Sequence, residues 1–460
     1  MPIRPVPAIL LCTLLLAPAL HASETEEEPR LPAADLVLPA LLAGPGYRVE
    51  PTASLHGYQA RFTLHTDWGE LQAESVEMLA IRIAEVPAMD AVFAAPVSAM
   101  LAEAAQDAAM APVRAVGEIV SRPVDTLVGL PMGTVRFFGN KVTRWGRRAG
   151  RLGDRIDQAV SHEGDPYRDP GGPMGATRLD LDAPARAWWE KPTREVTRAV
   201  RGEIGHRRAR RELAERLGVD PYTTNPILSE RLDRLAWMTA TGGFASRQLV
   251  AVATAGAGEA LGYSQDIQRL VLEASPEDLR ERNRDLLTHH CSDEELVDEL
   301  LDHRVFAPNL QTQLAELVQA LGPRSGCHAL LETALMAGNE VEARFVLNAL
   351  RLVLHYGGEG GRGGSLLAHG TTLAYLTPSG EFLLPVPVDR LSWTPQMRDW
   401  FDGRLLNGHR DRTLLVSGAI SPLAQQALTR QGWSLVAHLP YPGAPPYPAS
   451  PAAPAGTAPR

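Results

Sequence analysis

Apolar and polar residues alternate along residues 58–64, which is the pattern of a β-strand with one buried face. The tripeptide Asp67-Trp68-Gly69 then supplies a turn, and apolar residues resume over 71–76. Two such runs joined by a short polar turn predict a β-hairpin.

Helical spacing replaces the alternation at Glu77. Apolar residues recur every three or four positions from there to Met110, and the pattern is interrupted by Pro87, Pro96 and Pro112. Proline lacks an amide hydrogen and fits best in the first turn of a helix. We therefore expect each proline to begin a short helix rather than to lie inside a long one.

The most regular pattern of the chain lies between Phe138 and Ala159, where apolar residues are spaced alternately four and three positions apart. This spacing predicts an amphipathic helix, and its other faces are rich in arginine. The favoured interpretation is a helix that faces a core, and the alternative is a helix that binds an anionic membrane surface or a partner. The residues of that candidate surface are Phe138, Lys141, Arg144, Trp145, Arg148 and Arg151.

Further helices are expected after a Gly/Pro/Asp-rich linker at residues 161–185. An arginine-rich helix over 192–217 is expected to end at Gly218, and residues 227–355 are almost entirely helical in pattern. Ser275 and Ser292 are each followed by acidic residues, as at a capped helix start. The pattern is typical of a helical bundle or an α-solenoid, without a fixed repeat period.

The last quarter of the chain returns to short strands. Six glycines within 356–365 predict a flexible hinge, and Pro378-Ser379-Gly380 predicts the turn of a second hairpin. Pro385 and Pro387 should place its outgoing strand at a sheet edge. A strand–helix–strand unit is expected over 413–437, and the Pro/Ala-rich tail is expected to be disordered.

The expected fold class is mainly α with small β additions, that is, α+β. We expect these segments: a signal peptide at 1–22, a flexible acidic N-terminus at 23–46, a domain of β-hairpin plus helices at 47–160, a linker at 161–185, a helical domain at 186–355, a hinge at 356–365, a C-terminal α/β unit at 366–439 and a disordered tail at 440–460.

The N-terminus has the features of a secretory signal peptide. Arg4 precedes an apolar run over 8–20, and small residues follow at the expected cleavage position before Ser23. The run is shorter than the ~20 residues of a membrane span, and Cys12 lies inside the run rather than at its end, which disfavours a lipid anchor. We expect an exported protein, periplasmic or extracellular.

The net charge of −9 opposes binding to polyanions, so nucleic acid is not an expected partner. The 45% hydrophobic content can form substantial cores. A length beyond about 250–300 residues predicts more than one folded unit.

Export makes Cys291 and Cys327 a candidate disulfide, with two buried or free thiols as the first alternative. A metal site is a weaker alternative, because the spacing of these residues matches no common zinc motif. Its candidate ligands are His289, His290, Cys291, Cys327 and His328.

Motifs of catalysis and cofactor binding are absent from the sequence: there is no G-x-S-x-G elbow, and the glycine cluster lacks the ending of a phosphate loop. No cofactor is expected. We favour a non-catalytic interaction or scaffold protein with a protein partner in the cell envelope, and no feature indicates an oligomeric state.

Two other functions stay open. The first is an exported hydrolase, with its site where the C-terminal unit meets the helical domain. Such a site would use some of His289, His290, His328, His355, His369 and Asp389. The second is a peripheral envelope protein held by the basic helix.

Overall fold

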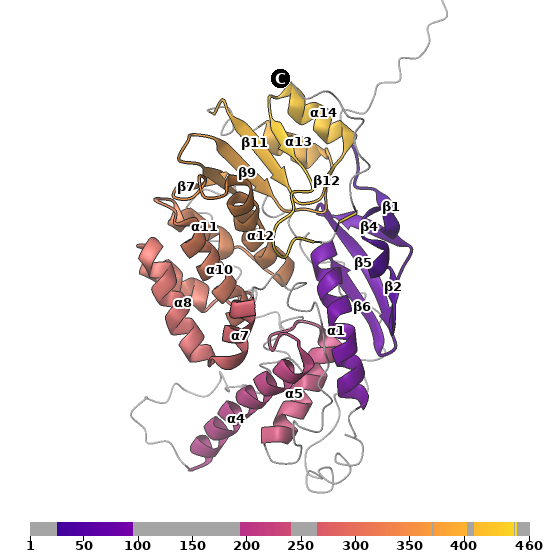
Figure 1. Ribbon diagram of the computed structural model, residues 1–460, viewed down its shortest axis with the longest axis vertical. Coiled ribbons are helices and arrows are strands. Elements are labelled where there is room, and N and C mark those ends of the chain that lie inside the picture. Colours follow the sequence, from indigo (N-terminus) through magenta and orange to yellow (C-terminus); the bar gives the residue numbers. More distant parts are fainter. Residues whose placement is uncertain are drawn as a thin grey trace, which may run out of the picture.

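Two larger β-sheets, one two-stranded sheet and a set of packed helices make up the described part of the protein (Figure 1). The computed structural model describes residues 25–94, 194–240, 265–369, 372–402, 409–445 and 447–448. The expected α+β class is confirmed. The predicted signal peptide, the predicted basic helix from Phe138 and the predicted linker at 161–185 lie outside these residues.

The N-terminal sheet is antiparallel and has the order β1-β4-β5-β3-β2, with β6 paired to the other side of β5. The predicted hairpin is confirmed, since β5 and β6 pair from Thr66 opposite Gly69 to Arg61 opposite Glu74. The strands are β1 (Arg30–Pro32), β2 (Ala43–Gly44), β3 (Tyr47–Val49), β4 (Thr52–His56), β5 (Gln59–Thr66) and β6 (Gly69–Glu74), with short 3-10 turns at Ala33–Asp35 and Pro39–Leu41.

The prediction of a flexible, unstructured acidic N-terminus is wrong for residues 25–46. Besides contributing β1 and β2, this segment uses its acids as hydrogen-bond acceptors. Glu28 accepts from the backbone N–H groups of Gly57 and Tyr58, whose φ angles are positive. Glu26 accepts from the backbone N–H of Trp393 at 2.6 Å. These carboxylates therefore satisfy buried backbone donors instead of extending into water.

Helix α1 (Val76–Ala94) is continuous, so the prediction that Pro87 begins a helix is wrong. Its buried residues continue across the proline, from Val86 to Ala88, Met89 and Val92. Packing against the sheet outweighs the loss of one helical hydrogen bond. The arginine-rich helix is confirmed as α4 (Arg194–Leu217), ended by Gly218 at φ 66°, and α5 (Pro226–Ala240) follows.

The central helices agree with the predicted array. They are α7 (Gln265–Glu273), α8 (Pro276–His290), α9 (Glu294–Leu301), α10 (Pro308–Leu321), α11 (Cys327–Ala334) and α12 (Glu340–Gly357). Ser275 caps α8 as expected, accepting from the backbone N–H of Asp278. The cap of α9 is Asp293, one residue after the predicted Ser292.

The C-terminal sheet is mixed, in the order β13-β11-β9-β8-β7. The predicted strand–helix–strand unit is confirmed, because β11 and β13 run parallel and α14 joins them. The elements are β7 (Ser365–His369), β8 (Thr372–Leu376), β9 (Phe382–Val386), β11 (Arg412–Val416) and β13 (Ser434–Val436), a small parallel pair β10 (Arg390–Leu391) and β12 (Ala419–Ile420), and helices α13 (Pro395–Phe401) and α14 (Pro422–Arg430).

The prediction that Pro385 and Pro387 place β9 at a sheet edge is wrong, since β9 lies between β8 and β11. The physical reason is that the described pairing between β8 and β9 is short. It involves Phe382 and Leu383 of β9 but does not reach Pro385. A missing amide hydrogen at Pro385 therefore costs no hydrogen bond on that side.

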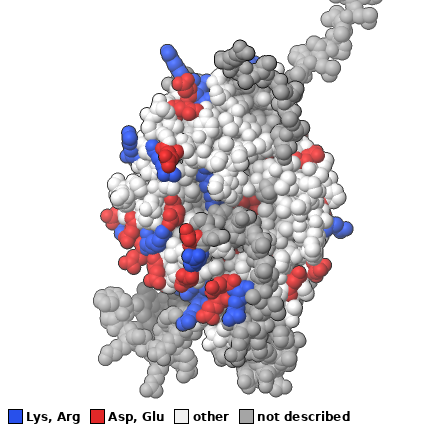
Figure 2. Space-filling model, in the orientation of Figure 1, with Lys and Arg blue, Asp and Glu red and all other residues white. Residues whose placement is uncertain are grey.

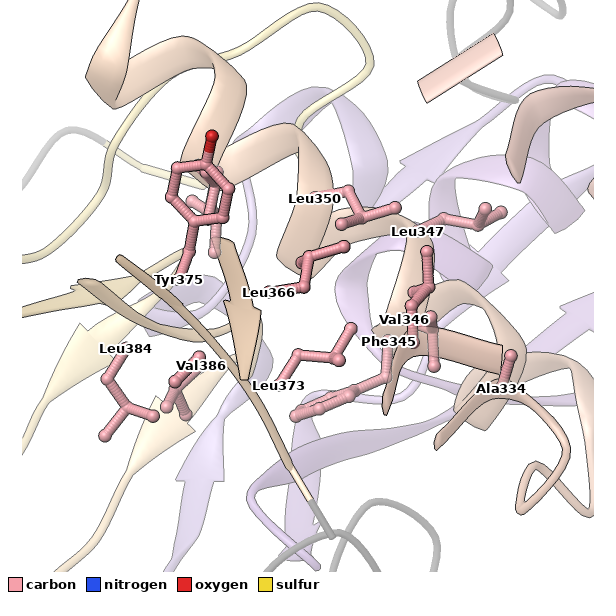
Figure 3. Packing of buried hydrophobic residues seen from close by; sticks show 14 of the residues in the cluster. Ala334, Phe345, Val346, Leu347, Leu350, Leu366, Leu373, Tyr375, Leu384 and Val386 are labelled. Carbon is pink, nitrogen blue, oxygen red and sulfur yellow. The ribbon is translucent and has the colours of Figure 1, made fainter. Parts of the chain in front are cut away.

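Two hydrophobic cores organise the described residues, and they differ from the predicted division into domains. One contains residues of α8–α12 together with the C-terminal sheet, so the helical segment and the C-terminal unit share a core (Figure 3). The other joins the N-terminal sheet and α1 to α4 and α5. Helices α4 and α5 thus pack with the N-terminal sheet, which lies far away in the sequence.

The glycine-rich segment 356–365 is bound to its surroundings, contrary to the prediction of a flexible hinge. The Tyr375 hydroxyl accepts from the backbone N–H of Gly364 and donates to the carbonyl of Gly361, both at 2.7 Å. The carbonyl of Gly364 accepts from the backbone N–H of Arg324 at 2.9 Å. Its glycines serve close packing, because a Cβ at Gly364 would overlap the carbonyl of Leu376.

Candidate functional site

A buried layer of polar residues joins α1 to α12. On α12 the polar positions are spaced four, four and three residues apart, which places them on one face of the helix. We call this set the polar layer: Glu77, Arg82 and Glu85 of α1, Glu340, Arg344, Asn348 and Arg351 of α12, and Thr223, Thr224 and Asn225 of the turn before α5.

Glu77 and Arg344 form the central ion pair of the polar layer. Nη1 of Arg344 donates to Oε1 of Glu77 at 3.0 Å, and both side chains are buried. Asn348 donates to the other carboxylate oxygen at 2.6 Å. Both oxygens of Glu77 therefore have hydrogen-bond donors, as a buried carboxylate requires.

A second cluster lies beside this pair. Nε of Arg344 donates to Glu340 at 2.8 Å, and Thr224 donates to the same carboxylate. Arg82 binds Glu85 at 3.0 Å, and Asn225 donates to Glu85 at 2.9 Å. Burial raises the pKa of Glu340, but Arg344, Arg82 and Thr224 outweigh that effect and hold it below its ordinary value.

Asp389 is the buried carboxyl group at the junction between the N-terminal sheet and the C-terminal sheet. It follows β9 and is 2% exposed. Its Oδ2 accepts from the backbone N–H groups of Ala60 at 2.8 Å and Val76 at 3.1 Å. Burial raises the pKa of Asp389 to about 6; the hydrogen bonds from Ala60, Tyr447 and Val76 oppose the rise, and nearby Glu77 adds to it.

The C-terminal strap, defined as residues 441–445 and 447–448, closes over this junction. Tyr441 is 7% exposed and belongs to the core of the C-terminal sheet, and Tyr447 packs against the N-terminal core. The Tyr447 hydroxyl donates to Oδ1 of Asp389 at 2.7 Å. This part of the predicted disordered tail thus makes defined contacts, whereas residues 449–460 lie outside the described residues.

A cavity of about 10 Å³ lies beneath the strap, which is room for about one water molecule. Its lining is mostly polar and includes Glu77, Asn348, Asp389, Ser417, Pro445 and Tyr447. The carboxylates here bind protein donors, so the arrangement chiefly ties the two cores together.

The structure places Cys291 and Cys327 at disulfide distance, with Cα atoms 5.2 Å apart. Cys291 caps the C-terminus of α8, and Cys327 is the first residue of α11. A bond between them would link two helices that are 36 positions apart in the sequence.

Reduction of this cysteine pair is expected to lower the free energy of unfolding by about 3–4 kcal/mol, because the open chain gains conformational entropy when unfolded. Urea unfolding with and without reductant measures the difference. Thiol titration in denaturant without reductant should detect neither cysteine. Two reactive thiols, beyond any from Cys12, would contradict the bond.

The other metal-ligand candidates have separate contacts. The rings of His289 and His290 contact each other, with centroids 4.8 Å apart. The ring nitrogens of His328 lie 3.1 Å from Asp293 and 3.2 Å from Glu332. Over the described ranges, no three His, Cys, Asp or Glu side chains lie close enough together to bind a metal ion.

The residues considered for a hydrolase site lie on different elements. His355 is exposed in the last turn of α12, and buried His369 packs against Trp400 at the end of β7. The carboxylate of Asp389 accepts hydrogen bonds from the backbone N–H groups of Ala60 and Val76 and from the Tyr447 hydroxyl. The candidate membrane surface, Phe138 to Arg151, is not among the described residues. Within the described part of the chain, every helix is too short or too polar to traverse a lipid bilayer.

Helices α7–α9 carry a strongly acidic surface. Residues 265–302 contain twelve Asp and Glu against four Arg, a net charge of −8. Figure 2 shows acidic groups on the side of the molecule where α8 lies. We define the acidic face by its exposed members: Asp266 and Glu273 of α7, Glu277, Asp278, Glu281 and Asp285 of α8, Glu294 and Glu295 of α9, and Asp302.

The acidic face contains a shallow depression, and several of its carboxylates or their neighbours pair with arginines. An open depression of about 340 Å³ is lined by Asp278, Glu281, Arg282, Asp285 and Leu286. Arg284 lies 2.8 Å from both Glu294 and Asp298 and links α8 to α9. Arg207 of α4 reaches Glu277 at 3.0 Å, which shows that this face accepts an arginine side chain from elsewhere in the fold.

Sequence reasoning missed the polar layer and the clasp between Asp389 and Tyr447. The signal for the layer is readable: Glu340, Arg344, Asn348 and Arg351 form a polar stripe on an otherwise apolar helix. No local signal pairs Asp389 with Tyr447. Comparison with known protein families, with curated protein sequences and with solved structures gives no match for this chain.

Proposed function

We propose that this chain is an exported, non-catalytic interaction protein of the cell envelope, and that its acidic face docks a basic segment of a protein partner. The observation that carries the proposal is the concentration of charge on α7–α9, where the net charge is −8 against −9 for the whole chain. Such a surface attracts a cationic partner and accelerates its association.

Two further features support the docking face. The depression contains half-buried Leu286 among the acids, so apolar contact can accompany charge pairing. The contact between Arg207 and Glu277 has the chemistry expected of the partner. Export is supported by the leader pattern of residues 1–22 and by a cysteine pair at disulfide distance.

The hydrolase alternative receives less support. A catalytic carboxyl group must reach its substrate, and the carboxyl candidate, Asp389, is occupied. Asp389 accepts hydrogen bonds from two backbone N–H groups and from Tyr447. These contacts are typical of groups that hold a fold together.

Neutralising four acids of α8 tests the proposal. In the variant Glu277→Gln, Asp278→Asn, Glu281→Gln and Asp285→Asn, capture of a partner from an envelope extract should fall at least about tenfold, because charge steering is lost. Immobilised protein and quantitative mass spectrometry measure the capture. Binding of the unaltered chain should also weaken as ionic strength rises from about 0.01 M to about 0.15 M.

A matched variant removes four exposed acids elsewhere: Asp35→Asn, Asp67→Asn, Glu70→Gln and Glu359→Gln. It has the same net charge as the α8 variant and should retain the partner. Equal retention by both variants, or equal loss from both, would show that the acidic face is not the docking site.

A further inference from the structure

The C-terminal strap is attached at two points to two different cores. Tyr441 lies in the core of the C-terminal sheet, and Tyr447 lies against the core of the N-terminal sheet. Pro445 and Tyr447 of the strap line the same cavity as Asp389 and Ser417. Displacement of the strap would therefore admit water to Asp389.

Asp389 connects the strap to the rest of the molecule. Its Oδ1 accepts from Tyr447 at 2.7 Å, and its Oδ2 accepts from the backbone N–H groups of Ala60 and Val76. One carboxyl group thus holds the start of β5, the start of α1 and the strap. Because these donors come from three segments, a change in its charge affects all three contacts.

We propose that Asp389 and Tyr447 act as a proton-linked clasp, which holds the strap over the cavity more firmly in mildly acidic than in neutral solution. The strap is a conformational device of the fold, and its release exposes the polar groups beneath it.

Two groups beside the clasp titrate in this pH range: Asp389, and His438, whose ring centroid lies 5.9 Å from that of Tyr447. Burial lowers the pKa of His438, so its protonation favours release in acid, and Asp389 is the group whose protonation holds the strap. Burial raises the pKa of both Tyr441 and Tyr447, so these phenols remain neutral. Glu77 is bound by Arg344 at 3.0 Å, and Arg351 lies 3.9 Å from the same carboxylate. The described hydrogen-bond partners of Asp389 include no arginine.

The direction of the pH effect follows from linkage. Burial raises the pKa of Asp389 to about 6 while the strap is bound. Hydration after release returns it toward the ordinary value of ~3.9. The bound state therefore holds more protons between these values, and release becomes more favourable as the pH rises through about 6. The release equilibrium should increase by up to about tenfold from pH 5 to pH 7.

A cysteine reporter beneath the strap measures its release. Ser417 lines the cavity and is 3% exposed, so Ser417→Cys should react with a maleimide mainly when the strap moves away. Rates are divided by those of an unstructured peptide at each pH, and Cys12→Ser removes the remaining thiol of the leader. In this background the corrected rate should rise up to about tenfold from pH 5 to pH 7.

Two variants and a second reporter define the outcome. With Asp389→Asn the corrected rate should no longer rise from pH 5 to pH 7, and with Tyr447→Phe it should be higher at pH 5. Ser229→Cys, equally buried at 3% exposure in α5, reports global unfolding and should stay protected. A change below twofold between pH 5 and 7, the same change with Asp389→Asn, or parallel labelling of Ser229→Cys would each overturn the clasp.

Discussion

Replacing Arg344 with methionine is expected to lower the free energy of unfolding by about 3–5 kcal/mol, because it leaves buried carboxylates without their partner. Arg344 binds Glu77 at 3.0 Å and Glu340 at 2.8 Å, and its side chain is almost completely buried. Methionine retains most of the volume, so the loss reports charge rather than packing. Equilibrium unfolding in urea at pH 7 measures it.

The loss should be smaller at pH 5 than at pH 7. Arg344 is the first of the groups that hold the pKa of Glu340 below its ordinary value, so its removal lets Glu340 take up a proton as the pH falls. A neutral carboxyl group costs less to bury than an unpaired carboxylate. An equal loss at both pH values would contradict this account.

Arg208→Met provides the matched control on the surface. Arg208 pairs with Glu212 at 3.0 Å, but these side chains are 77% and 44% exposed. Exposed pairs contribute little, so the expected loss is about 0.5 kcal/mol or less. If both methionine variants lose the same free energy of unfolding, the burial of Arg344 does not determine how much it contributes to stability. In the double variant Glu77→Gln with Arg344→Met, part of the stability should return.

Local patterns predicted the elements of this fold better than their arrangement. The hairpin of β5 and β6 and the unit of β11, α14 and β13 each lie within one short stretch of sequence. The packing of α4 and α5 against the N-terminal sheet joins residues more than 100 positions apart, for which no periodicity gives a signal. Pro385 is a second example. Whether a proline in β9 loses a hydrogen bond depends on where the pairing with β8 ends, which the local sequence does not show.

The candidate site was less predictable than the fold. The stripe on α12 could be recognised from spacing alone, but its partner Glu77 is 267 positions from Arg344. Composition favoured a disordered tail beyond residue 440. Tyr441, buried in one core, and Tyr447, packed against the other, overcome that tendency. A few anchoring side chains can order a segment whose average composition is that of a linker.

Gly326→Ala is expected to lower the free energy of unfolding by about 2–5 kcal/mol. Gly326 has φ 83°, which costs an alanine about 1–2 kcal/mol. The added Cβ would overlap the carbonyl of Leu366, and displacing β7 costs a further ~1–3 kcal/mol. That movement also breaks the 3.0 Å hydrogen bond from the backbone N–H of Leu366 to Ser325. Urea unfolding measures the loss.

Gly322→Ala separates the two causes within the same part of the fold. Gly322 ends α10 with φ 56°, and the nearest atom to an added Cβ is 4.0 Å away. Its substitution carries the backbone cost alone, about 1–2 kcal/mol. The difference between the two variants therefore measures the close approach of Gly326 to β7. Equal losses would mean that β7 moves without cost, and the tight contact between α11 and the C-terminal sheet would then not contribute to stability.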